Sequence, residues 1–310
     1  MESVRTEPFS YRGRFAPTPS GPLHFGSLVA AVASYADAKN WRGEWLLRID
    51  DLDPPRVVPG ADASILGTLE ALGMEWDGAV VYQSRRHDAY HAALHRLRRA
   101  GIVYPCACSR RDIADSGIAG IEGPVYPGTC RNGLPQRQRA RALRVRASDH
   151  TITFSDDIQG TVSQDLARSV GDFVVYRADH VYAYHLAAVI DDAEQGVTHV
   201  VRGADLLDST PRQIMLQGLL GLRTPGYAHV PVAVSEAGEK LSKQTHASAI
   251  DARAPAIAVA AALRFLGQEL PPAADCANLH DLWQWAIAHW RRERVPRVKT
   301  LPTHGRQAPH

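Results

Sequence analysis

The chain has 310 residues, of which 45% are hydrophobic and 22% charged, and its formal net charge is +2. This length and composition are typical of a soluble globular protein with a sizeable core. No apolar run approaches the roughly 20 residues that span a bilayer, and the N-terminal region has no apolar stretch with a cleavage site. These features exclude a membrane-spanning protein and a secretory leader, and we expect a cytoplasmic monomer.

The first distinctive stretch is RFAPTPSGPLHFGS, which covers residues 14–27. A short strand, a turn rich in proline and glycine, and an apolar helical pattern follow one another here. This order predicts a phosphate site, because backbone N–H groups and the positive end of the helix dipole point into the turn. Gly26 permits close approach of a nucleotide, and His24 is able to donate to phosphate oxygens. Taken alone, the stretch is equally consistent with a proline-rich loop before an ordinary helix.

Strands and helices alternate over the next segment. Residues 44–49 (EWLLRI) predict a buried strand that ends before Asp50. Helical patterns follow at 61–72 and, after Tyr82, in a segment that stops at Gly101, a suitable helix C-cap. The alternation predicts an α/β fold with a parallel sheet, whose ligands bind at the carboxyl ends of the strands.

The pattern changes between residues 103 and 172, where cysteines, glycines and short alternating runs predict a small mixed insertion. Cys106, Cys108 and Cys130 supply three soft ligands, whereas a structural zinc takes four. No histidine lies between Cys108 and Cys130, so the spacing leaves the fourth ligand open. A disulfide framework is not expected in a cytoplasmic protein, and Cys276 is interpreted as a lone structural thiol.

The α/β pattern then resumes with three apolar segments and a helix, at residues 173–176, 182–186, 198–201 and about 210–220. Residues 240–244 read KLSKQ, which taken alone is a solvated lysine-rich loop. Two further helical patterns follow, at 254–266 and 279–290. The remaining segment is rich in Pro, Arg and His, and we expect it to fray.

Basic residues gather in two places. A run without any acidic residue contains six arginines, Arg131, Arg137, Arg139, Arg141, Arg144 and Arg146. The tail from Arg291 has one acid, Glu293, against five more basic residues, Arg292, Arg294, Arg297, Lys299 and Arg306. Such runs are consistent with solvated surface or with phosphate contacts to a nucleic acid.

HFGS and KLSKQ together resemble the two signatures of class I aminoacyl-tRNA synthetases. The stretches RFAPTPSGPLHFGSL, RIDDLDPPR and VVRGADLLDST are similar to those of the glutamyl branch. The resemblance covers most of the chain and implies a Rossmann-like parallel-sheet catalytic domain with a zinc-binding insertion and a short helical C-terminal extension. The implied divisions are the first half of the catalytic domain, the insertion facing tRNA, the second half and the extension, at 1–102, 103–172, 173–250 and 251–310.

The resemblance also implies how ATP is used. A carboxylate attacks the α-phosphate, so catalysis is mostly positioning and electrostatic stabilisation. The residues implied for ATP are His24, Gly26, Ser27 and Lys243, and those implied for catalysis are His24, Lys240 and Lys243. The wider class usually has a second histidine where this chain has Ser27, and serine is common there in the glutamyl-Q subfamily.

Two arginines suit a substrate with two carboxylates. Arg14 and Arg202 can each pair bidentately with a carboxylate, which favours glutamate. By resemblance, Tyr184 hydrogen-bonds the substrate, Asp50 holds its ammonium group, and Phe15, Ala16, Pro17 and Thr18 complete the site. The family usually has glutamate at the place of Asp50, so the shorter side chain makes its contact through water or leaves it to a neighbour. His185 is expected to pack beside the site, and the resemblance makes Tyr126 the fourth zinc ligand.

Only 66 residues follow Gln244, too few for the domain with which the larger relatives grip an anticodon. In this the chain resembles glutamyl-Q tRNA(Asp) synthetases, which activate glutamate without tRNA and esterify it to queuosine in the anticodon loop of tRNA(Asp). The implied partners are L-glutamate, ATP with Mg²⁺, tRNA(Asp) carrying queuosine and one structural Zn²⁺, with no membrane. Two alternatives stay open: a truncated enzyme that charges a terminal ribose, and a non-catalytic tRNA-binding paralogue.

Overall fold

The structure is a computed structural model that describes residues 10–115, 119–236, 238, 250–251, 253–272 and 278–303. Its α-helices are α1 (Phe25–Asn40), α2 (Ala61–Ala71), α3 (His87–Arg99), α4 (Arg110–Ala114), α5 (Leu166–Ser169), α6 (Tyr184–Glu194), α7 (Thr210–Leu220), α8 (Pro255–Phe265) and α9 (Leu279–His289). Its first strands are β1 (Arg12–Phe15), β2 (Glu44–Ile49), β3 (Val81–Tyr82), β4 (Val103–Cys106), β5 (Ala119–Gly120), β6 (Gly123–Pro124) and β7 (Ala142–Val145). The later strands are β8 (Thr151–Asp156), β9 (Gly160–Asp165), β10 (Phe173–Tyr176), β11 (His199–Gly203), β12 (Gly226–Val230), β13 (Val232–Val234) and β14 (Thr300–Pro302).

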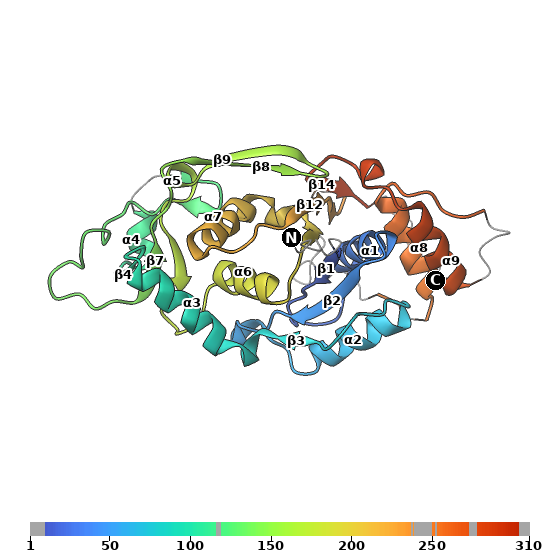
Figure 1. Ribbon diagram of the computed structural model, residues 1–310, viewed down its shortest axis with the longest axis horizontal. Coiled ribbons are helices and arrows are strands. Elements are labelled where there is room, and N and C mark those ends of the chain that lie inside the picture. Colours follow the sequence, from blue (N-terminus) through green and yellow to red (C-terminus); the bar gives the residue numbers. More distant parts are fainter. Residues whose placement is uncertain are drawn as a thin grey trace, which may run out of the picture.

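Parallel strands form the centre of the molecule (Figure 1). β1 pairs with β2, β2 pairs with β3, and β11 pairs with β12, all in parallel. The backbone N–H of Thr198, just before β11, donates to the carbonyl of Arg12, which brings the two groups of strands together. The expected parallel α/β fold is therefore confirmed, and the carboxyl ends of β1, β11 and β12 meet on one side.

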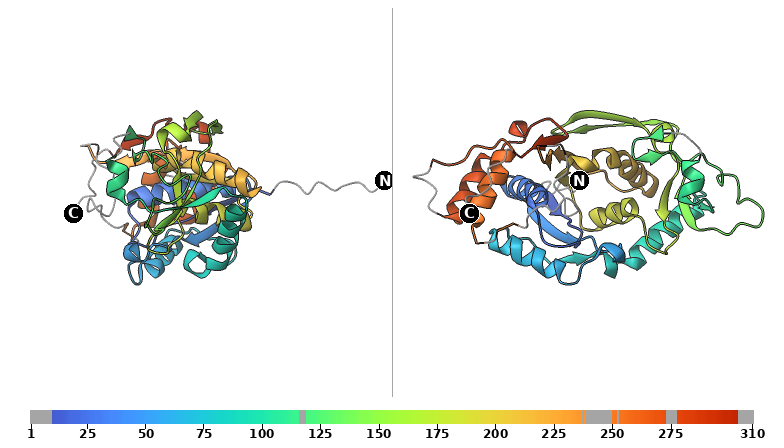
Figure 2. Two further views of the ribbon diagram at one scale, coloured as in Figure 1. Left: turned by 90° about the vertical axis from the view of Figure 1, so that its left-hand side faces the viewer. Right: turned by 180° about the vertical axis from the view of Figure 1, so that it is seen from behind.

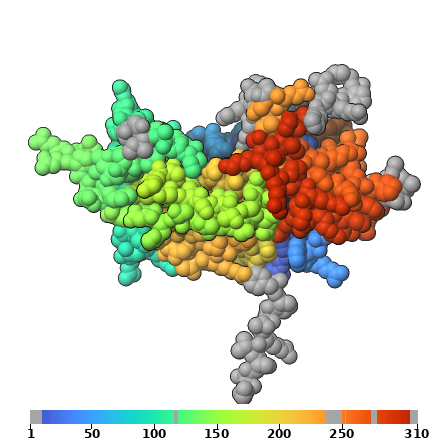
Figure 3. All heavy atoms as spheres, turned by 90° about the horizontal axis from the view of Figure 1, so that it is seen from above, coloured from blue at the N-terminus to red at the C-terminus, as the bar shows by residue number. Residues whose placement is uncertain are grey.

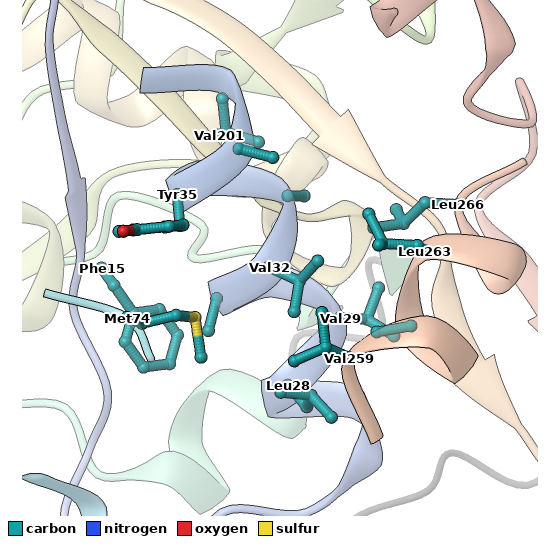
Figure 4. Packing of buried hydrophobic residues seen from close by; sticks show 14 of the residues in the cluster. Phe15, Leu28, Val29, Val32, Tyr35, Met74, Val201, Val259, Leu263 and Leu266 are labelled. Carbon is teal, nitrogen blue, oxygen red and sulfur yellow. The ribbon is translucent and has the colours of Figure 1, made fainter. Parts of the chain in front are cut away.

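Helix α1 is the centre of the largest apolar cluster. Its side chains Leu28, Val29 and Val32 face the labelled side chains of α8 in Figure 4. The helix is apolar on nearly every side, because β1 covers one face and α8 and α9 cover others. Each fully buried Leu or Val contributes roughly 1.5–3 kcal/mol, so this packing holds the start of α1 firmly in place.

The segment expected to form an insertion joins the central sheet directly. Antiparallel strands β4, β7 and β10 make one small sheet, while β8 and β9 make a long hairpin. At Asp156 and Tyr227 the end of β8 pairs with β12, so the hairpin extends the sheet of β11 and β12. Figure 2 shows the small sheet and α4 at the end of the molecule opposite α8 and α9. The domain boundaries stay a prediction.

Two expectations about secondary structure are wrong. The helix at 210–220 was expected to be the first helix of this region, yet helix α6 begins earlier, at Tyr184 within the apolar segment 182–186, and its buried residues Leu186, Val189 and Ile190 follow helical spacing. The tail was expected to fray from Arg291, yet residues 291–303 make specific contacts with the rest of the molecule. Arg292 pairs with the buried Asp37, and β14 pairs with β13. No helix in the described part of the chain has the length and apolar character needed to span a membrane.

Candidate active site

The turn between β1 and α1 has the geometry expected of a phosphate site. His24 is the N-cap of α1: its Nδ1 accepts from the backbone N–H of Ser27 at 3.3 Å, and its Nε2 lies 3.0 Å from the Ser27 hydroxyl. Since Nδ1 accepts, the ring proton of the neutral form lies on Nε2. The imidazole therefore caps the N-terminus of α1. The backbone N–H groups of the first turn lie at the positive end of the helix dipole.

A cavity of about 670 Å³ opens at this turn, at the carboxyl ends of β1, β11 and β12. Its lining includes ten of the residues expected in the site, namely Arg14, Phe15, Ala16, Pro17, Thr18, His24, Gly26, Ser27, Tyr184 and Arg202. Ser20, Arg56 and Asp205 also line it and were not expected. The two sides of the cavity come from segments almost two hundred residues apart, which only the parallel sheet brings together.

Arg14 and Arg202 are both buried, but their surroundings differ. Arg14 Nε donates to Asp192 at 3.2 Å, so its charge faces a carboxylate. Burial by itself raises the pKa of Asp192, but Arg14 and Arg48 outweigh it and hold the pKa below its usual range. Arg202 instead donates to the uncharged groups His229 and Thr210, at 3.0 and 2.8 Å. Arg202 is therefore the better placed of the two to receive a carboxylate from a ligand.

Asp50 does not line the cavity. Its carboxylate accepts from Arg48 Nε at 2.8 Å, and its backbone N–H donates to the carbonyl of Pro17. Burial raises the pKa of Asp50 to about 6, against the opposite effect of Arg48. Arg48 also donates to Asp192 at 2.7 Å, so the two acids and two arginines form one buried network. A role of Asp50 in holding an ammonium group stays a prediction.

Tyr184 and His185 begin helix α6 and lie differently. Tyr184 lines the cavity, whereas the ring of His185, with its Nδ1 buried, packs edge-on against Phe173. Burial, together with the nearby Arg212 and Arg202, holds the pKa of His185 well below its usual range. His185 is therefore neutral, and its expected place beside the site stays a prediction. Lys240, Lys243 and Cys276 lie outside the described residues.

Three cysteines meet in the insertion. The sulfur atoms of Cys106, Cys108 and Cys130 all lie within 4.8 Å of one another. The hydroxyl of Tyr126 is 3.4 Å from Cys106 Sγ and 3.9 Å from Cys108 Sγ, and it accepts from the backbone N–H of Cys130. Burial raises the pKa of Cys106, but hydrogen bonds with Tyr126 and Arg144 outweigh it and lower the pKa. Three sulfur atoms this close together could hold a metal ion such as zinc, and Tyr126 as its fourth ligand stays a prediction.

The fold relates this chain to known enzymes. Residues 10–254 match the family model of tRNA synthetases class I (E and Q), catalytic domain. A crystal structure of glutamate-tRNA synthetase from Elizabethkingia anophelis superimposes with a TM-score of 0.78 at 24% identity, covering 95% of this chain and 68% of that one. The fold and the matched residues define a class I tRNA synthetase catalytic domain.

Sequence relatives narrow the class. The protein named glutamyl-Q tRNA(Asp) synthetase in Aromatoleum aromaticum is 60% identical over 287 residues, which are 93% of this chain and 91% of that protein. The protein of the same name in Chromobacterium violaceum is 57% identical over 286 residues, covering 92% and 95%. The chain belongs to the glutamyl-Q tRNA(Asp) synthetase family.

Several buried polar residues beside the cavity were missed from the sequence. Arg48, Asp192, Asp156 and His229 are all less than a tenth exposed. Arg48 and His229 interrupt otherwise apolar strands, and an unexplained polar residue in such a segment is the signal that was available. Asp156 ends a strand that alternates with Thr and Ser, and Asp192 follows another acid near the end of α6, so neither stood out in the sequence. The sequence does not show which residues these side chains contact, because strand register or helix packing brings the partners together.

Proposed function

We propose that this chain, as a cytoplasmic monomer, activates L-glutamate with ATP in the absence of tRNA and transfers it to queuosine in the anticodon loop of tRNA(Asp). The observation that carries the proposal is the cavity in which the buried Arg14 and Arg202 approach the N-terminus of α1. A helix N-terminus suits phosphate and a buried arginine suits carboxylate, so one cavity offers both substrates a matching charge. The names of the relatives support the same assignment.

In the first step, an oxygen of the glutamate α-carboxylate attacks the α-phosphorus of ATP. The bond to the bridging oxygen breaks, and pyrophosphate leaves with its magnesium ions. His24, Gly26 and Ser27 are proposed to receive the phosphates, with Lys240 and Lys243 assigned to the leaving pyrophosphate. These groups act through charge and position, because the attacking oxygen already belongs to the substrate.

Glutamate is proposed to present its side-chain carboxylate to the arginines. Tyr184 lines the same cavity and is assigned a hydrogen bond to the substrate, and the segment from Phe15 to Thr18 lines it too. In the part of the chain that the structure describes, Arg202 donates hydrogen bonds to uncharged groups, although Asp205 lines the same cavity. A neutral amide in place of the substrate carboxylate leaves a buried guanidinium poorly compensated, which disfavours glutamine.

In the second step, a hydroxyl of the queuosine cyclopentenediol attacks the carbonyl carbon of glutamyl-adenylate, an ester bond forms, and AMP leaves. The insertion is the surface proposed to receive the anticodon loop, and it projects at one end of the molecule in Figure 3. Within its basic run, Arg131 and Arg144 are engaged by Asp172. Arg146 is exposed, but it donates to the carbonyl of Arg131. The other exposed arginines of the run, which are proposed to contact phosphates, are Arg137, Arg139 and Arg141.

One structural Zn²⁺ is proposed to bind Cys106, Cys108 and Cys130, with Tyr126 as the fourth ligand. The metal supplies a cross-link between two loops that contribute few apolar contacts. Arg144 lies with its guanidinium carbon 4.0 Å from the ring centre of Tyr126 and donates to Cys106 Sγ at 3.3 Å. This arginine orients both ligands, as outer hydrogen bonds generally do at metal sites.

The first experiment measures ATP–pyrophosphate exchange without tRNA, with glutamate and with glutamine. We expect exchange with glutamate to exceed that with glutamine at least about 30-fold, from the roughly 2–4 kcal/mol cost of an unpaired buried charge. Lys243→Ala should lower the exchange rate far more than it weakens glutamate binding, since pyrophosphate charge develops in the transition state. Equal rates with the two amino acids contradict the substrate assignment.

The second experiment locates the acceptor. Labelled glutamate is offered to four RNAs: intact tRNA(Asp) with queuosine, the same tRNA without queuosine, the tRNA with its terminal adenosine removed, and an isolated anticodon stem-loop with queuosine. We expect transfer to all except the RNA lacking queuosine. Loss of transfer on removal of the terminal adenosine instead identifies an enzyme that charges the terminal ribose. Exchange without transfer to any of the four RNAs supports the activation of glutamate and contradicts the proposed acceptor.

A further inference from the structure

A chain of buried polar contacts runs from the β8–β9 hairpin to the cavity. Asp156, the last residue of β8, lies with Oδ2 2.5 Å from Nδ1 of His229 on β12. Nε2 of the same ring accepts from Nε of Arg202 on β11 at 3.0 Å. All three residues are buried, with exposed fractions of 2%, 0% and 5%. The three strands are adjacent in one sheet, so the contacts lie along its breadth.

The position of each proton in these buried contacts follows from the chemistry of the side chains. A guanidinium keeps all its protons, so His229 Nε2 must offer a lone pair to Arg202. The neutral ring then carries its proton on Nδ1 and donates it to Asp156. Burial and the nearby Arg202 lower the pKa of His229 to about 4, although Asp156 acts in the opposite direction. The imidazole is therefore neutral and in one tautomer at neutral pH.

The same contacts leave one nitrogen of Arg202 for a ligand. Nε is held by His229, and Nη2 donates to the hydroxyl of Thr210 at 2.8 Å. Nη1 is buried and has no hydrogen-bond partner among the described residues. A buried guanidinium N–H without a partner is costly, and Arg202 lies on the cavity wall. Nη1 is the nitrogen by which Arg202 can receive a carboxylate.

We propose that His229 and Asp156 are positioning residues, which hold Arg202 through one fixed imidazole tautomer so that Nη1 is offered to the substrate carboxylate. The inference rests on the proposed function, in which Arg202 binds glutamate. A neutral ring between Arg202 and Asp156 orients the guanidinium without giving it a carboxylate in contact. Arg14 shows the alternative arrangement, because Asp192 contacts it directly.

Asp156→Asn tests the tautomer with little change of shape. Asp156 Oδ1 accepts from the backbone N–H groups of Ile158, Gln159 and His229, so the amide oxygen of asparagine takes that place. The amide NH₂ then faces His229 Nδ1 and forces the ring proton to Nε2, where it opposes Arg202 Nε–H. We expect the KM for glutamate to rise about 10- to 100-fold, with kcat and the KM for ATP within about 3-fold of wild type.

Two substitutions of His229 form a matched pair. The oxygen of glutamine reaches the place of Nε2, so His229→Gln keeps an acceptor for Arg202. The KM for glutamate of this variant should stay within about 3-fold of wild type. The shorter asparagine reaches only the place of Nδ1, so His229→Asn should raise that KM about 10- to 100-fold. Tyr11→Phe removes another buried hydrogen bond, to Asp37, and controls for loss of stability alone.

Equal KM values for His229→Asn and His229→Gln, or a loss of kcat in place of the change in KM, overturn the proposal. The tautomer is also read without activity, from ¹⁵N chemical shifts of histidine-labelled protein. His229, assigned by its absence from His229→Gln, should show a protonated Nδ1 in wild type and a protonated Nε2 in Asp156→Asn. The opposite wild-type pattern overturns the proposal. If wild type shows no glutamate-dependent exchange, the proposed function fails, while the ¹⁵N result still decides for or against the fixed tautomer.

Discussion

Arg14 and Arg202 lie on strands whose neighbours are set by backbone hydrogen bonds, whereas the three cysteines lie at the end of β4 and in loops. The cavity is backed by the largest apolar cluster of the molecule. The cysteine cluster is backed by a much smaller set of apolar residues, such as Tyr104 and Leu134, and by a hydrogen bond from Arg144. Strand register places a side chain whether or not a ligand is bound. We therefore expect the cavity to keep its geometry alone and the cysteine cluster to depend on its metal.

The largest effect should come from Arg202→Ala. Loss of a buried charged partner costs about 3–4 kcal/mol, so kcat/KM for glutamate in ATP–pyrophosphate exchange should fall about 100- to 1000-fold. The metal content should stay at one zinc per chain, because the hydrogen-bond partners of Arg202 all lie outside the cysteine cluster. The exposed Arg99 on α3 offers a control, and Arg99→Ala should behave as wild type. A variant that also loses zinc contradicts the independence of the two regions.

Removal of the metal should affect the cysteine cluster and leave the cavity unchanged. Treatment with a chelator, or Cys108→Ser, should abolish bound zinc by elemental analysis and increase hydrogen exchange in 103–145. Transfer to tRNA should fall about 10- to 100-fold by analogy with other losses of metal-ligand support, while glutamate activation changes less than about 2-fold. A metal-free wild type with a protected insertion refutes the zinc assignment.

Acid should weaken the sheet before the insertion. The pKa of His229 is lowered from 6.5 to about 4, so on acidification the unfolded chain binds a proton that the folded chain does not. Stability from His229 is therefore complete above pH 6.5 and is lost as the pH falls toward 4. Denaturant unfolding at pH 7 and pH 5 should differ by about 2 kcal/mol for this group, and His229→Gln should flatten the difference.

The insertion has a later acid limit. Burial raises the pKa of Asp172, but hydrogen bonds from Arg131 and Tyr104 outweigh it and lower the pKa from 3.8. Its contribution is therefore present above pH 3.8 and is lost only as the pH falls through the lowered value. Hydrogen exchange at pH 5 should show the insertion still protected. Loss of its protection before that of β12 contradicts this order.

The smallest effect concerns the exposed arginines of the insertion. Changing Arg137, Arg139 and Arg141 to Gln together should weaken tRNA binding about 10-fold and reduce the slope of log K against log salt by about 3. Activation of glutamate should be unchanged. A matched triple change on α3, at Arg96, Arg98 and Arg99, should leave the slope of tRNA binding as it is. Equal losses of tRNA affinity from both triple variants would show that the overall charge of the protein, and not the position of these arginines, determines tRNA binding.

The local elements were predictable, whereas long-range pairs were not. The strand at 44–49 and the helix at 210–220 coincide with β2 and α7, because each carries its own apolar pattern. The start of helix α6 was missed because large apolar residues occupy every second position from Tyr182 to Leu186, which is the pattern of a strand. The arginines of the site were found through short motifs, and their roles stay predictions. Asp156 and His229 are 73 residues apart and meet only through the register of β8 on β12.

The pairing of β14 with β13 bears on how the protein can be shortened. Val232, Ala233 and Val234 pair in register with Thr300, Leu301 and Pro302, and β14 is the only partner of β13 in the described sheets. A chain cut before Thr300 leaves an apolar edge with unpaired backbone groups, which is a template for strand addition from another molecule. Such a chain should therefore aggregate with increasing concentration, visible as light scattering, and a soluble replacement should keep these three residues.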